Sequence, residues 1–123
     1  MAEKKIVLVI DDDPDIIETV QAILSAKGYV VISASNGKQG FEVVKKTNPD
    51  LVLCDMMMEE IDSGMQTAQH IKRYNSEIPV FLISSIAETT SATTQIRELG
   101  FIGIIQKPVE PARLLSIVQS IIG

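Results

Sequence analysis

Short apolar runs alternate with longer amphipathic segments along the whole chain. The runs are rich in β-branched residues, whereas the segments between them repeat apolar residues at helical spacing. This alternation is typical of a parallel sheet in which each strand is followed by a helix that crosses back over the sheet, so we predict an α/β fold. The expected strands are 5–11, 30–34, 50–55, 79–84 and 102–107, and the expected helices are 14–26, 38–47, 65–74, 88–99 and 111–122.

Five strands and five helices in strict alternation match the flavodoxin-like doubly wound fold, a five-stranded parallel sheet of order 2-1-3-4-5. The first run is apolar on both faces, as expected for a central strand that helices cover on each side. The 123 residues, 46% of them hydrophobic, suit one domain that spans residues 1–123.

The net charge of the chain limits the kinds of partner that it is expected to bind. A net charge of −5 argues against direct binding to nucleic acid, whose phosphates the average surface would repel. No apolar run approaches the roughly 20 residues of a membrane span, and the first residues do not have the pattern of a secretory signal. We expect a cytoplasmic protein without membrane insertion, in which the single cysteine, Cys54, is buried and unbridged.

Four of the apolar runs stop on residues that can do chemistry. The carboxyl ends of parallel strands converge on one crevice, so these residues should share a site. Two like charges about 4 Å apart cost about 4 kcal/mol at an effective dielectric of 20, so clustered acids must protonate or bind a cation. Oxygen ligands of this kind suit Mg²⁺, and the lone His70 offers no zinc site. The four strand ends carry Asp11-Asp12-Asp13, Asp55, Ser84 and Lys107.

Lys107 and Ser84 turn a bare metal site into a candidate phosphoryl site. A lysine can pair with an anion, and a hydroxyl can donate to a phosphoryl oxygen. Asp55 can then act as the nucleophile that forms an aspartyl phosphate. Each residue also has a purely structural alternative, as a helix cap, a turn acid or a loop residue, but their joint occurrence at four strand ends favours the chemical interpretation.

The chain resembles the receiver domain of bacterial response regulators. The resemblance covers essentially the whole chain and rests on four motifs, IVLVIDDDPD, PDLVLCDMMM, IPVFLISS and QKPVEPARLL. It implies that Asp55 accepts a phosphoryl group from a sensor histidine kinase or a histidine phosphotransfer protein. Asp11, Asp12 and Asp55 would hold Mg²⁺, with the Met57 backbone carbonyl as a further ligand, and the bond between Lys107 and the following proline would be cis.

The resemblance also implies a signalling module that alters a surface read by a downstream protein target. Such a module is not an enzyme, because it catalyses only its own phosphorylation and slow dephosphorylation. Three departures stand out. Glu59 replaces a common proline, and Ile104 replaces the usual aromatic switch, with Phe101 as a candidate substitute. Met57 and Ile86 are apolar where the family flanks the route of the attacking water, so we expect slow hydrolysis.

Two other functions stay open on the sequence alone. The domain could be a receiver-like scaffold that no longer takes phosphate, although the complete acid set argues against this. It could also be an aspartate-nucleophile phosphatase, although Pro14 and Asp15 follow the acid run where that class has a different pattern. Separately, the last helix has an apolar stripe wider than one buried face requires, which suggests a homodimer contact.

Overall fold

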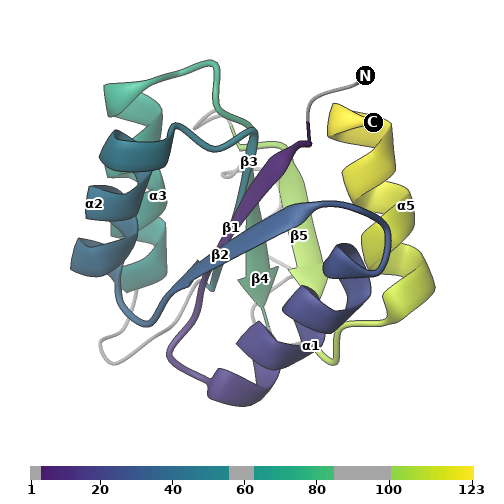
Figure 1. Ribbon diagram of the computed structural model, residues 1–123. Coiled ribbons are helices and arrows are strands. Elements are labelled where there is room, and N and C mark those ends of the chain that lie inside the picture. Colours follow the sequence, from purple (N-terminus) through teal and green to yellow (C-terminus); the bar gives the residue numbers. More distant parts are fainter. Residues whose placement is uncertain (1–3, 56–62, 85–100) are drawn as a thin grey trace.

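The computed structural model describes residues 4–55, 63–84 and 101–123, with backbone only for 63–65. These residues form one parallel sheet of order β2-β1-β3-β4-β5 and four helices (Figure 1). The strands are β1 (Ile6–Ile10), β2 (Val30–Ala34), β3 (Leu51–Asp55), β4 (Val80–Ser84) and β5 (Gly103–Gln106). The helices are α1 (Pro14–Ser25), α2 (Gly37–Thr47), α3 (Ser63–Tyr74) and α5 (Pro111–Ile122).

The predicted α/β class, the strand order and every element within the described residues are confirmed. The boundaries agree to within two residues, the largest difference being that α3 begins at Ser63 rather than Met65. The fifth expected helix, 88–99, lies outside the described residues, so the count of five helices is not established.

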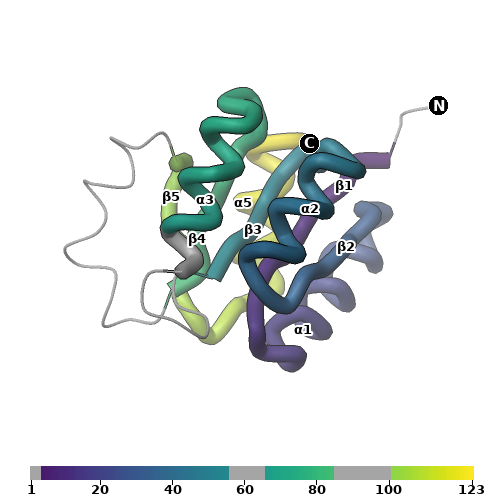
Figure 2. The backbone as a smooth tube through the Cα atoms, turned by 90° about the vertical axis from the view of Figure 1, so that its left-hand side faces the viewer, coloured from purple at the N-terminus to yellow at the C-terminus, as the bar shows by residue number. Residues whose placement is uncertain are grey.

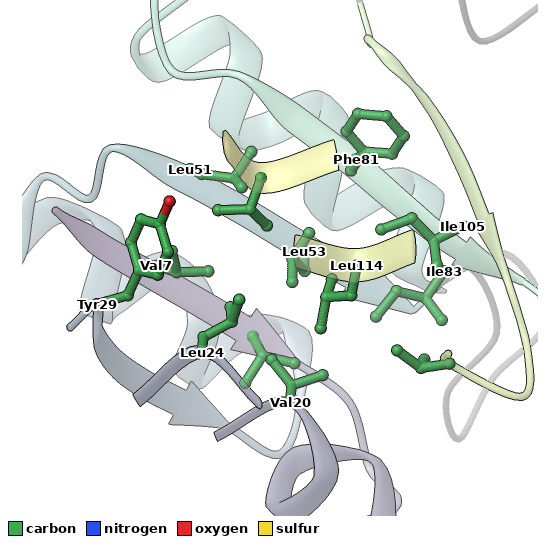
Figure 3. Close-up of a cluster of buried hydrophobic side chains, with 13 residues drawn as sticks. Val7, Val20, Leu24, Tyr29, Leu51, Leu53, Phe81, Ile83, Ile105 and Leu114 are labelled. Carbon is green, nitrogen blue, oxygen red and sulfur yellow. The ribbon is translucent and has the colours of Figure 1, made fainter. Parts of the chain in front are cut away.

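The sheet lies between two helical layers, α1 with α5 and α2 with α3 (Figures 1 and 2). Alternate side chains of each central strand enter the two cores, as a doubly covered parallel strand requires. Leu8 and Ile10 pack in the core beneath α2 and α3, while Val7 and Val9 pack in the core with α1 and α5 (Figure 3).

The apolar stripe of α5 is used mainly inside the domain. Leu114 and Val118 are buried. The remaining apolar residues of the helix are half-buried against the same core, so packing accounts for more of the stripe than its width suggested, and the homodimer stays a prediction. They are Leu115, Ile117, Ile121 and Ile122.

Polar side chains begin the first two helices. The Asp13 carboxylate accepts a hydrogen bond from the Asp15 N–H at 2.9 Å, and the Asn36 side chain accepts one from the Gln39 N–H at 2.8 Å. Each cap satisfies an amide that the first turn of a helix leaves unpaired. These caps fix where the chain turns away from the carboxyl ends of β1 and β2. Within the described residues, we find no helix with the length and apolar character needed to span a membrane.

Candidate functional site

Three carboxylates gather where β1 and β3 end. The two strands are neighbours in the sheet, with Ile10 paired to Cys54, so the residues that follow them meet at the same edge. Asp11, Asp12 and Asp55 each place a carboxylate oxygen within 4.8 Å of the others. Asp11 and Asp55 are buried, whereas Asp12 is exposed. The predicted acid cluster is therefore present in the fold.

Asp11 is held firmly at the floor of this cluster. Its backbone N–H donates to the Ala34 carbonyl at 3.1 Å, and its Oδ1 accepts a hydrogen bond from the Asp13 N–H at 2.9 Å. Its Oδ2 is buried and accepts no hydrogen bond from any residue that the structure describes. Burial disfavours the charged form and raises the pKa of the Asp11 carboxyl above its usual value, although the Asp13 amide and the charge of Lys107 oppose that rise.

Lys107 reaches the acid cluster from the end of β5. Its Nζ lies 3.5 Å from Asp11 Oδ2 and 3.4 Å from Asp55 Oδ2. Burial alone would lower the pKa of this lysine, but Asp11 and Asp55 outweigh it and the pKa is raised, so Lys107 stays charged at neutral pH. Its side chain is 28% exposed, so it is less buried than the Asp11 and Asp55 side chains that it contacts. The peptide bond between Lys107 and Pro108 is cis, as predicted.

Ser84 stands between these groups in the sheet. It is fully buried at the end of β4, and its carbonyl accepts a hydrogen bond from the Lys107 N–H at 2.8 Å. The preceding residue, Ile83, is paired to Asp55 across β3 and β4. The fold therefore places the predicted serine on the strand between those that lead to Asp55 and Lys107.

Cys54, next to Asp55, is buried, as predicted. Its Sγ lies 3.6 Å from the Asp55 carbonyl oxygen, to which the thiol can donate. Burial raises the pKa of the thiol, so it stays protonated at neutral pH. The lone His70 is exposed on α3 and is not part of the acid cluster.

The donors of the acid cluster fit a hard divalent cation. All three are carboxylate oxygens, the ligand type that Mg²⁺ prefers. The buried Asp11 Oδ2 has no hydrogen-bond donor in the described residues, and a cation would supply the missing partner. Exposed Asp12 leaves the cluster open on one side, which suits an ion that keeps some of its water.

Several predictions near the site lie outside the described residues. These concern the Met57 carbonyl as a ligand, Met57 and Ile86 beside the water route, and the loop around Glu59. Ile104, at the usual position of the aromatic switch, is half-buried and packs against the core beneath α2 and α3. The candidate substitute, Phe101, is buried in that same core.

One positioning contact was missed by sequence reasoning. The Asp13 N–H orients the Asp11 carboxylate, while the Asp13 side chain caps α1, so one residue serves both the site and the helix. An acid that accepts from the amide two residues onward is a common turn, so the run of three aspartates carried this signal.

The family model described as the response regulator receiver domain matches residues 7–119 of this chain. The chain belongs to the response regulator receiver domain family. The match runs from β1 into α5, so it includes every strand end that contributes to the acid cluster and its lysine. The resemblance inferred from the four strand-end motifs is confirmed.

Individual relatives agree with this assignment. The receiver domain is 32% identical over 120 residues to "Probable transcriptional regulator ycf27" of Porphyridium aerugineum, a match that covers 98% of this chain and 49% of that protein. It is 36% identical over 104 residues to the transcriptional regulatory protein ZraR of Klebsiella oxytoca, covering 85% of this chain and 23% of that protein. The chain therefore spans about half or less of the curated relatives it matches.

Solved structures agree on the fold of the receiver domain. The receiver domain of NtrX from Brucella abortus superposes with a TM-score of 0.85 at 26% identity, covering 93% of this chain and 95% of that one.

Proposed function

We propose that this receiver domain accepts a phosphoryl group on Asp55 in a two-component phosphorelay. The observation that carries the proposal is the buried Asp55 carboxylate in the cluster with Asp11, with the Lys107 ammonium 3.4 Å from its Oδ2 and 3.5 Å from Asp11 Oδ2. A carboxylate clamped by a lysine and an acid cluster that fits Mg²⁺ can attack phosphorus while its own charge and that of the incoming group are offset.

The proposed donor is the phosphohistidine of a sensor histidine kinase or of a histidine phosphotransfer protein. An Asp55 carboxylate oxygen attacks the phosphorus, an O–P bond forms, and the N–P bond breaks with its electron pair leaving on the imidazole. Asp11, Asp12 and Asp55 would hold Mg²⁺, which when bound offsets negative charge on the phosphoryl oxygens. Lys107 pairs with a phosphoryl oxygen, and the Ser84 hydroxyl donates to another.

The domain acts in this proposal as a signalling module rather than an enzyme with an external substrate. It catalyses its own phosphorylation and a slow hydrolysis of the product. Phosphorylation then alters the surface that a protein target binds. The relatives named above are transcriptional regulators and much longer than this chain. A DNA-binding output would therefore reside outside the 123 residues, and the receiver itself makes no direct contact with nucleic acid.

Intact mass spectrometry after incubation with Mg²⁺ and acetyl phosphate tests the proposal. Wild type is expected to gain one phosphoryl group, and Asp55→Asn none. Asp50→Asn is the matched control, because Asp50 precedes the same strand and its Oδ2 accepts the Ile6 N–H, a role that an asparagine oxygen can keep. This control is expected to gain the group as wild type does.

The same samples distinguish the alternatives. A wild-type protein that gains no phosphoryl group and binds no Mg²⁺ would indicate a scaffold. Steady release of phosphate from added phosphomonoesters that persists in Asp55→Asn would indicate a phosphatase whose nucleophile lies in the Asp11-Asp12-Asp13 run. Either outcome would contradict the proposed role of Asp55 as a stable acceptor.

A further inference from the structure

The layer formed by α2 and α3 is basic, although the whole chain has a net charge of −5. α2 contains three lysines and one glutamate, while α3 contains one lysine, one arginine and no acid, which together give a net charge of +4. The opposite layer differs, because α1 contains two acids and no base, and α5 contains a single arginine. The basic residues of the α2–α3 layer are Lys38, Lys45, Lys46, Lys72 and Arg73.

Helix dipoles do not account for this charge. Cations in the last turn of a helix are stabilising, and four of the five basic residues stand there. However, α1 and α5 have no basic residue in their last turns, so the fold does not depend on such pairing. Lys38 stands in the first turn of α2, where a cation opposes the dipole. The helix dipole therefore does not explain its position, although Glu42, four residues on, offers it an opposite charge.

A cavity of about 310 Å³ opens between the two helices beside Lys38. Its walls include Phe41 and Glu42 of α2, and Gln66 and His70 of α3. Figure 2 shows α2 and α3 running side by side on this face of the sheet. The cavity has the size of a small ligand pocket, large enough for one apolar side chain of a partner.

Aromatic rings extend the cavity wall toward the far end of the groove. The Phe41 ring centroid lies 6.2 Å from that of His70 and 5.8 Å from that of Tyr74, which meets Phe41 edge-on. Lys45 Nζ lies 4.9 Å above the Phe41 ring. Tyr74 is 50% exposed although it is a large aromatic residue. Apolar area and positive charge are thus exposed together in one groove.

We propose that the α2–α3 groove binds a short acidic segment of a partner protein, with one apolar side chain seated in the cavity. Lys38, which lines the cavity, and Lys46 and Arg73, which are exposed on the same two helices, would attract the acidic residues, and the aromatic wall would hold the apolar one. This binding surface goes beyond the proposed phosphoryl transfer, since none of its residues belongs to the acid cluster.

A nucleic acid fits the groove less well. Lys72 Nζ already donates to the carbonyls of Ser76 and Ile78 at 2.8 and 3.0 Å, and Lys45 is paired with Glu42 at 3.0 Å. The remaining cations are too few for a phosphate backbone, which is bound by many contacts in series. A short peptide needs only a few.

The test is a ¹⁵N NMR titration of the whole chain with a capped synthetic peptide of glutamates around a single tryptophan. The peptide is expected to shift the amide signals of α2 and α3. Lys38→Glu is expected to weaken binding roughly fivefold, since it removes one attraction and adds one repulsion. His70→Ala, which removes part of the cavity wall without removing a lysine, is expected to weaken it as well. Lys27→Glu, the same reversal at an exposed lysine after α1, is the matched control and should bind as wild type does.

Four results would overturn the proposal. The first is an absence of shifts in α2 and α3 at millimolar peptide. The second is equal affinity for a peptide with lysines in place of the glutamates. The third is a loss of peptide affinity in Lys27→Glu as large as that in Lys38→Glu, which would show that the peptide responds to the net charge of the chain and not to the groove. The fourth is tighter binding of single-stranded DNA than of the acidic peptide to the same helices. The amide spectra of the variants also report whether each one is folded.

Discussion

Asp11 carries a charge that the protein alone does not fully compensate. The carboxylate is completely buried, and among the described residues one of its two oxygens has no hydrogen-bond donor. Lys107 Nζ is 3.5 Å away, beyond the usual range of a strong charge-assisted bond. The site therefore favours a cation at the expense of the stability of the metal-free domain, a common cost of a functional site.

Replacing this acid by its neutral isostere should stabilise the metal-free protein. Asp11→Asn keeps an oxygen for the Asp13 N–H and removes the buried charge, so we expect the free energy of unfolding at neutral pH to rise by about 1 kcal/mol. Urea denaturation without divalent ions measures this change. Asp12→Asn, at an exposed position of the same cluster, should have a smaller effect. A clear loss of stability in Asp11→Asn would contradict the account.

Mg²⁺ should make wild type more stable than Asp11→Asn, the reverse of their order without metal. An ion that binds the native state alone stabilises it by mass action, so Mg²⁺ should raise the free energy of unfolding of wild type well above its metal-free value. Asp11→Asn lacks one ligand and should respond much less. Denaturation curves at increasing Mg²⁺ check the difference, and equal responses of the two proteins would remove Asp11 from the ligand set.

Cys54 should be chemically silent in the folded domain. Its side chain is buried, so a reagent in solution cannot reach it. Burial also raises the pKa of the thiol, so the reactive thiolate is scarce at neutral pH. We expect a disulfide reagent such as Ellman's reagent to react only as fast as the protein opens, and rapidly in denaturant. Fast labelling under native conditions would show that the end of β3 is less tightly packed than described.

At the scale of elements, close packing of α2 on β1 depends on a glycine. A Cβ at buried Gly40 would lie 2.8 Å from Ile10 Cγ1, which is closer than real contacts allow. Ile10 is the last residue of β1, immediately before Asp11, so this contact also fixes the floor of the acid cluster. The helix cannot move outward without losing its packing against the strand.

Gly40→Ala is therefore expected to lower the free energy of unfolding by about 1–2 kcal/mol, although alanine is the better helix former. Thermal or urea denaturation measures this loss. Ile10→Val should cost less stability in the Gly40→Ala background than in wild type, because it removes atoms that the new methyl group meets. Strictly additive effects of the two substitutions would contradict the packing described here.

The elements themselves could be predicted well because two signals coincide at each of them. Buried parallel strands read as apolar runs, and turn or capping residues such as Asp13 and Asn36 separate them from the helices. The errors in the predicted strand boundaries occur at strand ends, because hydrogen bonds continue there past the last regular residue. The Pro79 carbonyl still accepts the Val52 N–H, and the Lys107 N–H still donates to Ser84, so both residues continue the ladder in part.

What the sequence could not predict are contacts between distant side chains. The acid cluster could be inferred because parallel strands bring their ends together. The meeting of Phe41 with His70 and Tyr74 depends instead on how α2 and α3 are rotated against each other. Apolar spacing fixes that rotation only to within a broad face. The sequence shows that the α3 segment contains no acidic residue, but only the structure shows that this helix packs beside the basic helix α2.

At the scale of the whole molecule, the stability of the domain should depend on pH through the acid cluster. A carboxyl whose pKa is raised on folding contributes stability below its unfolded pKa, and this contribution is lost as pH rises through its folded pKa. The advantage of Asp11→Asn over wild type should therefore shrink as pH falls and the wild-type carboxyl becomes neutral. Paired urea titrations from neutral to mildly acidic pH measure the difference, and an advantage that grows on acidification would contradict the assigned direction.

The molecule thus separates two kinds of surface. The carboxyl edge of the sheet carries the acids and Lys107, which suit phosphoryl chemistry. The α2–α3 face carries exposed cations and aromatic rings, which suit an acidic partner. β1 borders both surfaces, since it ends in the acid cluster and packs under α2. Chemistry and docking can then vary independently among receivers of this fold.

The central claim is that Asp55 itself carries the phosphoryl group. Reduction by borohydride after incubation with acetyl phosphate and Mg²⁺ tests it directly, because borohydride converts an acyl phosphate into an alcohol and leaves a free carboxylate unchanged. We expect tandem mass spectrometry to find homoserine at position 55, dependent on both the phosphoryl donor and Mg²⁺. Homoserine at another aspartate, or an unreduced Asp55 in a protein that has gained phosphate, would contradict the account.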